Sequence, residues 1–166
     1  MNIRPSENRD REEIVRIYNQ SIPTNKSTAD MEPVEVNDRI EWFKEHTPHN
    51  YPIFVSETEN GITGWLSISP YRPGRKALRY TAEVSYYVDF DYHGQGIASS
   101  LLKYAIEYCP KIEIKNLFAI LLEHNNTSIK LLEKFGFRKW GFLPRVADFN
   151  GNECGQFYYG LHISKD

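Results

Sequence analysis

The stretch Glu83–Leu102, EVSYYVDFDYHGQGIASSLL, contains a strand, a glycine-bearing turn and the start of a helix. Polar and apolar residues alternate up to Val88, which is typical of a strand with one buried face. The turn Gly94-Gln95-Gly96 follows, and apolar residues then recur at helical spacing from Ile97 onwards. A glycine turn at a helix N-terminus presents unpaired backbone N–H groups, which together with the helix dipole favour an anion. The stretch therefore predicts a phosphate site, of the kind that holds a pyrophosphate-bearing cofactor.

Two common phosphate-binding motifs do not fit this turn. A Walker loop needs a lysine directly after its last glycine, whereas the next lysine here is Lys103. A Rossmann fingerprint needs a third glycine, where this chain has Ser99, and an acidic residue roughly 20 residues further on, whereas Glu123, after the next apolar run, lies somewhat too far away. The preceding strand also has a polar face that carries Glu83, whereas a Rossmann strand is apolar on both faces. The remaining alternative is a turn whose glycines serve backbone conformation alone.

Two motifs in the chain resemble signatures of the GNAT N-acetyltransferase superfamily. His93–Ala98 (HGQGIA) resembles the signature [RQ]-x-x-G-x-[GA], and Asn125–Phe137 (NNTSIKLLEKFGF) resembles N-x-x-S-[IV]-x-[LM]-[YH]-E-K-x-G-F. Three further stretches, at 37–43 (NDRIEWF), 51–52 (YP) and 80–83 (YTAE), resemble the phosphinothricin acetyltransferase-like branch. The two signatures occur in order and are separated by one strand, so together they are a specific match.

The resemblance implies the GNAT acyl-CoA N-acyltransferase fold, an α/β fold with a mixed, mostly antiparallel central sheet flanked by helices. The length of 166 residues fits a single domain over residues 1–166. Periodicity and turn residues predict the order β-α-α-β-β-β-α-β-α-β-β. We expect strands near 3–4, 53–57, 62–68, 79–88, 117–122, 138–149 and 154–162, and helices after Ser6 (as N-cap), over 36–43, 97–109 and 125–135.

Composition and charge limit the classes of partner. The net charge of −2 gives no reason to expect a nucleic acid or a membrane surface as partner. Charged residues from Arg4 onwards and the lack of a long apolar run predict no signal peptide and no membrane span. Cys109 and Cys154 lie far apart in sequence, so we expect reduced thiols and a cytoplasmic protein. The five histidines form no ligand pattern, so we expect no metal.

Glu83 is the candidate catalytic residue for acetyl transfer to an amine. An alkylammonium is protonated near neutral pH, so a general base is needed, either directly or through one water. Glu83 lies on the polar face of the strand that leads into the phosphate turn, and one strand can therefore position both cofactor and base. The matching family residue is regarded as the base. The alternative is a solvated glutamate on a strand.

The resemblance also implies contacts with acetyl-CoA as co-substrate. Backbone groups of Tyr86, Tyr87 and Val88 would line the pantetheine arm, where one N–H would polarise the acetyl carbonyl. Asn125 and Ser128 would bind the same arm, although Asn125 could equally be a plain helix N-cap. The pyrophosphate would be held by His93, Gly94, Gln95, Gly96, Ile97, Ala98 and Ser99.

Three departures from the family pattern affect these expectations. His93 stands where the signature has Arg or Gln, although an imidazole N–H could still serve the phosphate. Leu132 stands where many relatives carry Tyr or His as the acid for the departing thiolate, which leaves that acid unassigned. Glu153–Gln156 replaces a His-Asp pair that relatives often carry after the last hairpin turn.

A basic cluster precedes Glu83 and is the candidate acceptor site. Arg suits a carboxylate or phosphinate bidentately, although a solvated loop is the alternative interpretation. The resembled branch acetylates small amino-acid analogues such as phosphinothricin and methionine sulfoximine and is commonly homodimeric. Other amines (a polyamine, an aminoglycoside, a peptide N-terminus) and a catalytically idle acyl-CoA-binding module remain alternatives. The candidate acceptor residues are Arg72, Arg75, Lys76, Ala77, Leu78 and Arg79.

Overall fold

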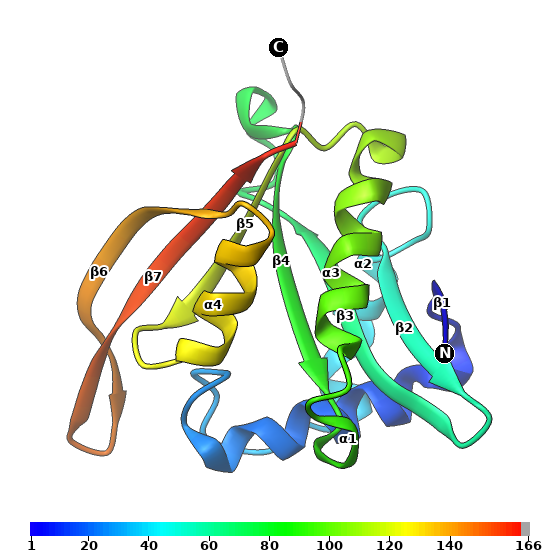
Figure 1. Ribbon diagram of the computed structural model, residues 1–166, viewed down its shortest axis with the longest axis horizontal. Helices are drawn as coiled ribbons and strands as arrows, with labels where there is room; N and C mark the ends of the chain where they lie inside the picture. The colour runs from blue at the N-terminus through cyan, green and yellow to red at the C-terminus, as the bar shows by residue number, and fades with distance from the viewer. Residues whose placement is uncertain (164–166) are drawn as a thin grey trace.

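The computed structural model describes residues 1–163, which form one seven-stranded sheet with helices on both faces (Figure 1). The spatial order of the strands is β1-β2-β3-β4-β5-β7-β6. Every neighbouring pair is antiparallel except β4 and β5, which are parallel. The strands are β1 (Asn2–Pro5), β2 (Ile53–Thr58), β3 (Gly61–Pro70), β4 (Thr81–Val88), β5 (Asn116–Leu122), β6 (Arg138–Phe149) and β7 (Asn152–His162).

Four α-helices cover the sheet. α1 (Arg11–Ser21) and α2 (Ile40–Glu45) pack on one face, and α3 (Ile97–Tyr108) and α4 (Asn126–Lys134) pack on the other (Figure 1). No helix within residues 1–163 is long and apolar enough to cross a membrane. Short 3₁₀ segments lie at Asn8–Asp10, Ile22–Thr24, Val36–Arg39, Lys76–Leu78, Phe90–Tyr92 and Cys109–Ile112.

The sheet opens between β4 and β5, and this opening positions the site. The two strands pair only at Thr81↔Asn116, Ala82↔Leu117 and Glu83↔Phe118. Beyond Glu83 both strands continue without pairing with each other, β4 to Val88 and β5 to Leu122. Figure 1 shows the resulting wedge, with the N-terminus of α4 beside it.

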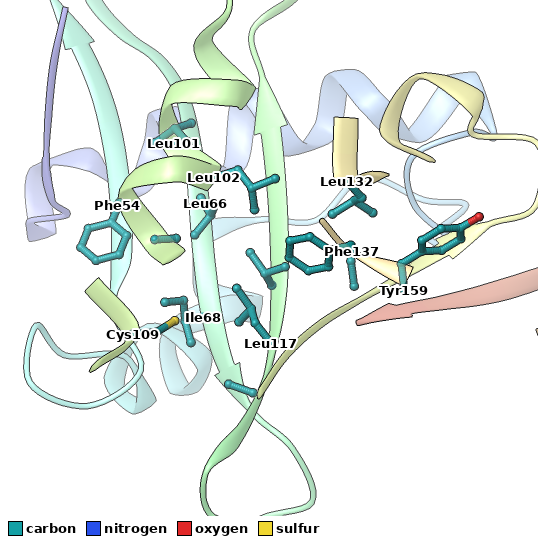
Figure 2. Packing of buried hydrophobic residues seen from close by; sticks show 14 of the residues in the cluster. Phe54, Leu66, Ile68, Leu101, Leu102, Cys109, Leu117, Leu132, Phe137 and Tyr159 are labelled. Carbon is teal, nitrogen blue, oxygen red and sulfur yellow. The ribbon is translucent and has the colours of Figure 1, made fainter. Parts of the chain in front are cut away.

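The largest of the three apolar clusters within residues 1–163 lies under α3 and α4. Figure 2 shows Leu101 and Leu102 of α3 packed against Leu66 of β3, with Leu132 of α4 beside Phe137. All five of these side chains are fully buried. The apolar stripe predicted from Ile97 onwards is therefore confirmed as the core face of α3, which fixes the start of this helix beside the open end of the wedge.

The element order agrees with the prediction, with three local differences. Ser6 is not a helix cap: Glu7 holds that position, because its N–H donates to Asp10 Oδ2 at 2.7 Å in a reciprocal capping box. The second helix begins with a 3₁₀ turn at Val36. The central strand starts at Thr81 instead of 79, because residues 76–78 form a 3₁₀ turn.

Candidate active site

A groove of about 480 Å³ runs along the wedge from the glycine turn to the N-terminus of α4. Its walls come from β4, α3, α4 and the segment after α1, which are distant in sequence. Of the predicted cofactor residues, all but Gln95 line it. These lining residues are Tyr86, Tyr87, Val88, His93, Gly94, Gly96, Ile97, Ala98, Ser99, Asn125 and Ser128.

The glycine turn has the geometry of an anion site. Gly94 and Gly96 have φ of 75° and 77°, in the left-handed region that favours glycine. The N–H groups of residues 94–96 donate no backbone hydrogen bond within the part of the chain that the structure describes. The first-turn amides of α3 are also without intrahelical partners. As the sequence predicts, the backbone N–H groups at this turn are therefore available to an anion.

The backbone of β4 also presents polar groups to the groove. The N–H of Asp89 donates to Thr63 O of β3 at 2.9 Å. Because successive residues of a strand direct their backbone groups to opposite sides, Tyr86 and Val88 direct theirs into the wedge. A hydrogen bond from His93 Nε2 to Val88 O at 2.9 Å is consistent with this direction of the Val88 carbonyl. That bond uses the N–H of a neutral His93, so only its protonated form has a second N–H for a phosphate.

Asn125 acts as the N-cap of α4 within the groove wall. Its Oδ1 accepts from the N–H of Ser128 at 3.3 Å. The cap uses the oxygen, and the amide nitrogen is left as the group for a ligand. Both interpretations of Asn125, as cap and as groove residue, are therefore compatible with the structure.

Glu83 lies where the wedge begins, on the face of the sheet that α1 and α2 cover. It shares that face with Tyr87 of β4 and with its cross-strand neighbour Ser69 of β3. Burial, which penalises the charged form, raises the pKa of the Glu83 carboxyl, and no cation among residues 1–163 opposes this effect. A carboxylate of this kind is more basic than an exposed glutamate, as a general base requires.

Aromatic rings surround the start of the wedge near Glu83. Phe118 of β5 is the register partner of Glu83. Tyr71 contacts the Phe118 ring edge-on at 5.0 Å between centroids, and Tyr158 stacks on it at 5.8 Å. On the same face His46 Nε2 lies 3.0 Å from Ser69 Oγ. Glu83 therefore lies among groups that can pack on a small organic acceptor.

The predicted basic cluster lies outside the groove, on the exposed loop between β3 and β4. The Arg79 guanidinium stacks on Tyr80 at 4.1 Å and donates to Lys76 O at 2.7 Å, so this arginine is engaged within the loop. Arg72 and Arg75 are exposed. The structure does not bring Arg72, Arg75, Lys76, Ala77, Leu78 or Arg79 into contact with the groove.

Sequence reasoning missed one wall of the groove, the segment that follows α1. Thr24, Lys26 and Ser27 line the groove there, and Lys26 adds a positive charge. Long-range hydrogen bonds hold this segment: His124 Nε2 donates to Asn25 O at 2.7 Å, and Tyr87 Oη donates to Ser27 O at 3.3 Å. Its polar, irregular sequence carries no local signal of this position.

Similarity to known proteins covers nearly all of the chain. The profile of the acetyltransferase (GNAT) family matches residues 11–137. The chain is 43% identical over 165 residues to the Bacillus subtilis protein named "Putative phosphinothricin acetyltransferase YwnH", covering 99% of this chain and 100% of that protein. It is 30% identical over 151 residues to the L-methionine sulfoximine/L-methionine sulfone acetyltransferase of Pseudomonas paraeruginosa, covering 90% and 87%. The solved structure of yncA from Salmonella typhimurium with its cofactor acetyl-CoA has a TM-score of 0.91 and 25% identity, covering 99% and 95%.

Proposed function

Because the chain belongs to the acetyltransferase (GNAT) family, we propose that it transfers the acetyl group of acetyl-CoA to the amino group of a small amino-acid-like acceptor. One observation carries this proposal most directly. A single strand, β4, places Glu83 at one end of the wedge and leads into the glycine turn at the other. A thioester lying along the wedge would thus have the base and the phosphate donors at opposite ends.

The residues of the groove fit acetyl-CoA. The free amides of residues 94–99 suit a pyrophosphate, and Lys26 supplies a cation for its charge. The wedge-facing backbone groups of Tyr86 and Val88 can pair with the amides of a pantetheine arm, as a neighbouring strand would. A backbone N–H at this point would also polarise the acetyl carbonyl.

Glu83 would accept the proton of the attacking amine, directly or through one water. The nitrogen attacks the thioester carbon, the C–S bond breaks, and its electron pair goes to sulfur. The raised pKa of Glu83 makes its carboxylate a better acceptor for this proton than an exposed one.

The acceptor class rests on the relatives and on the charge of the β3–β4 loop. Relatives are named for phosphinothricin and for methionine sulfoximine and sulfone, which are small amino-acid analogues. The loop with Arg72, Arg75 and Lys76 directly precedes β4 and would attract a carboxylate or phosphinate. The same charge would repel a polyamine or an aminoglycoside.

The test is release of free thiol from acetyl-CoA with a panel of amines. The panel holds methionine sulfoximine, phosphinothricin, free amino acids, a polyamine and a short peptide. We expect release with the anionic amino-acid analogues. Release only with the polyamine or the peptide would overturn the acceptor class, and no release alongside acetyl-CoA binding would favour an idle acyl-CoA-binding module.

Variants of the β3–β4 loop test the acceptor site separately. Arg75→Ala and Arg72→Ala should raise KM for an anionic acceptor and leave KM for acetyl-CoA unchanged. Arg138→Ala, at an exposed arginine at the start of β6, is the matched control. Arg79 is a poor choice for this purpose, since its stacking on Tyr80 is part of the loop structure. Unchanged acceptor KM in both variants would remove the loop from the acceptor site.

We also propose that the protein is a cytoplasmic homodimer. Cys109 and Cys154 are both free and buried, which fits a reducing compartment. Edge strand β6 exposes four large apolar side chains, Trp140, Phe142, Leu143 and Val146. An exposed apolar edge strand of this kind favours a second copy of the chain as partner.

A further inference from the structure

The departing thiolate lacks its usual partner on α4. Leu132 occupies the position where many members of the family carry a Tyr or His as acid. The Leu132 side chain is fully buried, with 0% of its surface accessible to solvent, and it packs beside Phe137 (Figure 2). A donor that stabilises the negative charge on the sulfur therefore has to come from another residue.

Tyr86 brings a hydroxyl group to the same place from β4. Together with Val88 its side chain packs on the α3 and α4 face of the sheet, whereas Glu83 lies on the opposite face. A small cavity of about 60 Å³ lies at the base of the wedge, and Tyr86, Ser128 and Leu132 all line it. Tyr86 and Ser128 also line the main groove, so the cavity and the groove share part of their walls.

The hydroxyl of Tyr86 is buried and has no hydrogen-bond partner within residues 1–163. Burial raises the pKa of the phenol and the nearby Ser128 hydroxyl lowers it, but no hydrogen bond joins the two groups in this structure. A buried polar group without a partner is costly and rare in a folded protein. Such a donor in the wall of a binding groove indicates a partner that arrives with the ligand.

We propose that the Tyr86 hydroxyl donates a hydrogen bond to the sulfur of the departing thiolate, in place of the acid that Leu132 cannot supply. This role rests on the proposed acetyl transfer. As the C–S bond breaks, its electron pair goes to sulfur, and the amine proton goes to Glu83. The thiolate then takes a proton from solvent, so the products are the amide and the free thiol, and Tyr86 is unchanged.

The phenol acts as a hydrogen-bond donor and not as a proton source. Burial raises the pKa of Tyr86 to about 12, well above the ordinary thiol value of about 8.5. Proton transfer from phenol to thiolate would therefore be uphill, whereas a hydrogen bond to the charged sulfur is favourable in a site of low dielectric. No residue lining the cavity carries a charged side chain: the lining consists of Ser27, residues 84–87 of β4, residues 119–121 of β5, the N-cap Asn125, and Ser128 and Leu132 of α4.

Tyr86→Phe tests the role kinetically, because it removes only the hydroxyl. We expect kcat to fall about ten- to a hundredfold, with KM for acetyl-CoA nearly unchanged. Tyr104→Phe is the matched control, since Tyr104 lies on α3 against Phe54 and outside the groove. An unchanged kcat in Tyr86→Phe would overturn the proposal.

Product binding tests the hydrogen bond without any acceptor, so its outcome is independent of the acceptor class. The ratio of the Kd of CoA to that of desulfo-CoA, which lacks the thiol, is measured at about pH 7 and about pH 9.5, below and above the ordinary thiol pKa. At the higher pH the thiol of CoA is ionised, and in Tyr86→Phe its thiolate has lost the hydrogen-bond donor. The increase of this ratio between the two pH values should therefore be about tenfold larger in Tyr86→Phe than in wild type or Tyr104→Phe. The same ratio in all three proteins would overturn the hydrogen bond even if kcat had fallen.

Discussion

At the residue scale, Glu83 combines a catalytic requirement with a cost in stability. Its carboxyl is largely buried, and desolvation alone raises its pKa. The folded state therefore holds this proton more tightly than the unfolded state does. The stability from that preference is present below the unfolded pKa and is lost as pH rises through the folded pKa. At neutral pH the ionised carboxylate destabilises the fold.

Glu83→Gln should therefore separate activity from stability. We expect kcat to fall about 10²- to 10⁴-fold through loss of the base. The free energy of unfolding at neutral pH should rise by on the order of 1 kcal/mol, because an uncharged group replaces a desolvated charge. Activity and thermal unfolding against pH check both, with the exposed Glu59→Gln as control. An equally active Glu83→Gln would show that the base assignment is wrong.

Wild-type activity should show the same group in its pH profile. A raised pKa means that the base is protonated, and inactive, over a wider acidic range than an exposed glutamate. The acidic limb of kcat against pH should therefore lie above the ordinary value of 4.5 for glutamate. A profile whose acidic limb falls at or below that value would contradict the burial of the active carboxylate.

At the element scale, the phosphate turn is fixed by a contact with α1. Asp89 is 4% exposed, accepts from Arg16 of α1 at 2.5 Å and caps the turn by accepting from the N–H of Asp91 at 3.0 Å. Gln20 of α1 in turn accepts from the N–H of Phe90 at 3.2 Å. Two residues of one helix thus hold the segment that leads into the glycine turn.

Asp89→Ala should loosen both the fold and the turn. Loss of the buried carboxylate removes the ion pair and the cap, and we expect a destabilisation of about 2–3 kcal/mol, since Arg16 is partly exposed and is also paired with Glu13. KM for acetyl-CoA should rise about tenfold. Urea unfolding and steady-state kinetics measure the two effects, and Glu59→Ala, at an exposed carboxylate between β2 and β3, is the control. A destabilised variant with unchanged KM would show that the glycine turn keeps its shape without this contact.

The same elements show what the sequence could predict. The glycine turn and the cap at Asn125 depend on residues within a few positions of one another, so local pattern was sufficient. The alternation of side chains along β4 predicts that Glu83 and Tyr86 lie on opposite faces of the sheet. The wall at Lys26 was missed because its position depends on hydrogen bonds to distant segments. Ser6 was assigned as cap because Ser and an acidic residue compete closely for that role, and here the reciprocal bonds of Glu7 and Asp10 win.

At the scale of the whole molecule, the two larger apolar cores stabilise opposite faces of the sheet, but the edge formed by β6 is left open. β6 pairs only with β7, and most of its side chains are exposed. Trp140 and Phe142 cover glycines of β7, Gly160 and Gly155, where a Cβ would meet the rings at 2.1 and 2.5 Å. These rings therefore support the hairpin itself. Leu143 and Val146 lie at its irregular segment and do not share that role.

Leu143→Lys combined with Val146→Lys should therefore dissociate the proposed dimer without unfolding the hairpin. Leu143 and Val146 are 38% and 51% exposed, so a lysine is tolerated in the monomer, whereas burial of two unpaired charges between copies should weaken the Kd by about two orders of magnitude. Met31→Lys, at a side chain that is 43% exposed on another surface, is the matched control and should remain dimeric. Sedimentation over a concentration series measures the mass. A monomeric wild-type protein, or a double variant that stays dimeric, would exclude β6 as the interface.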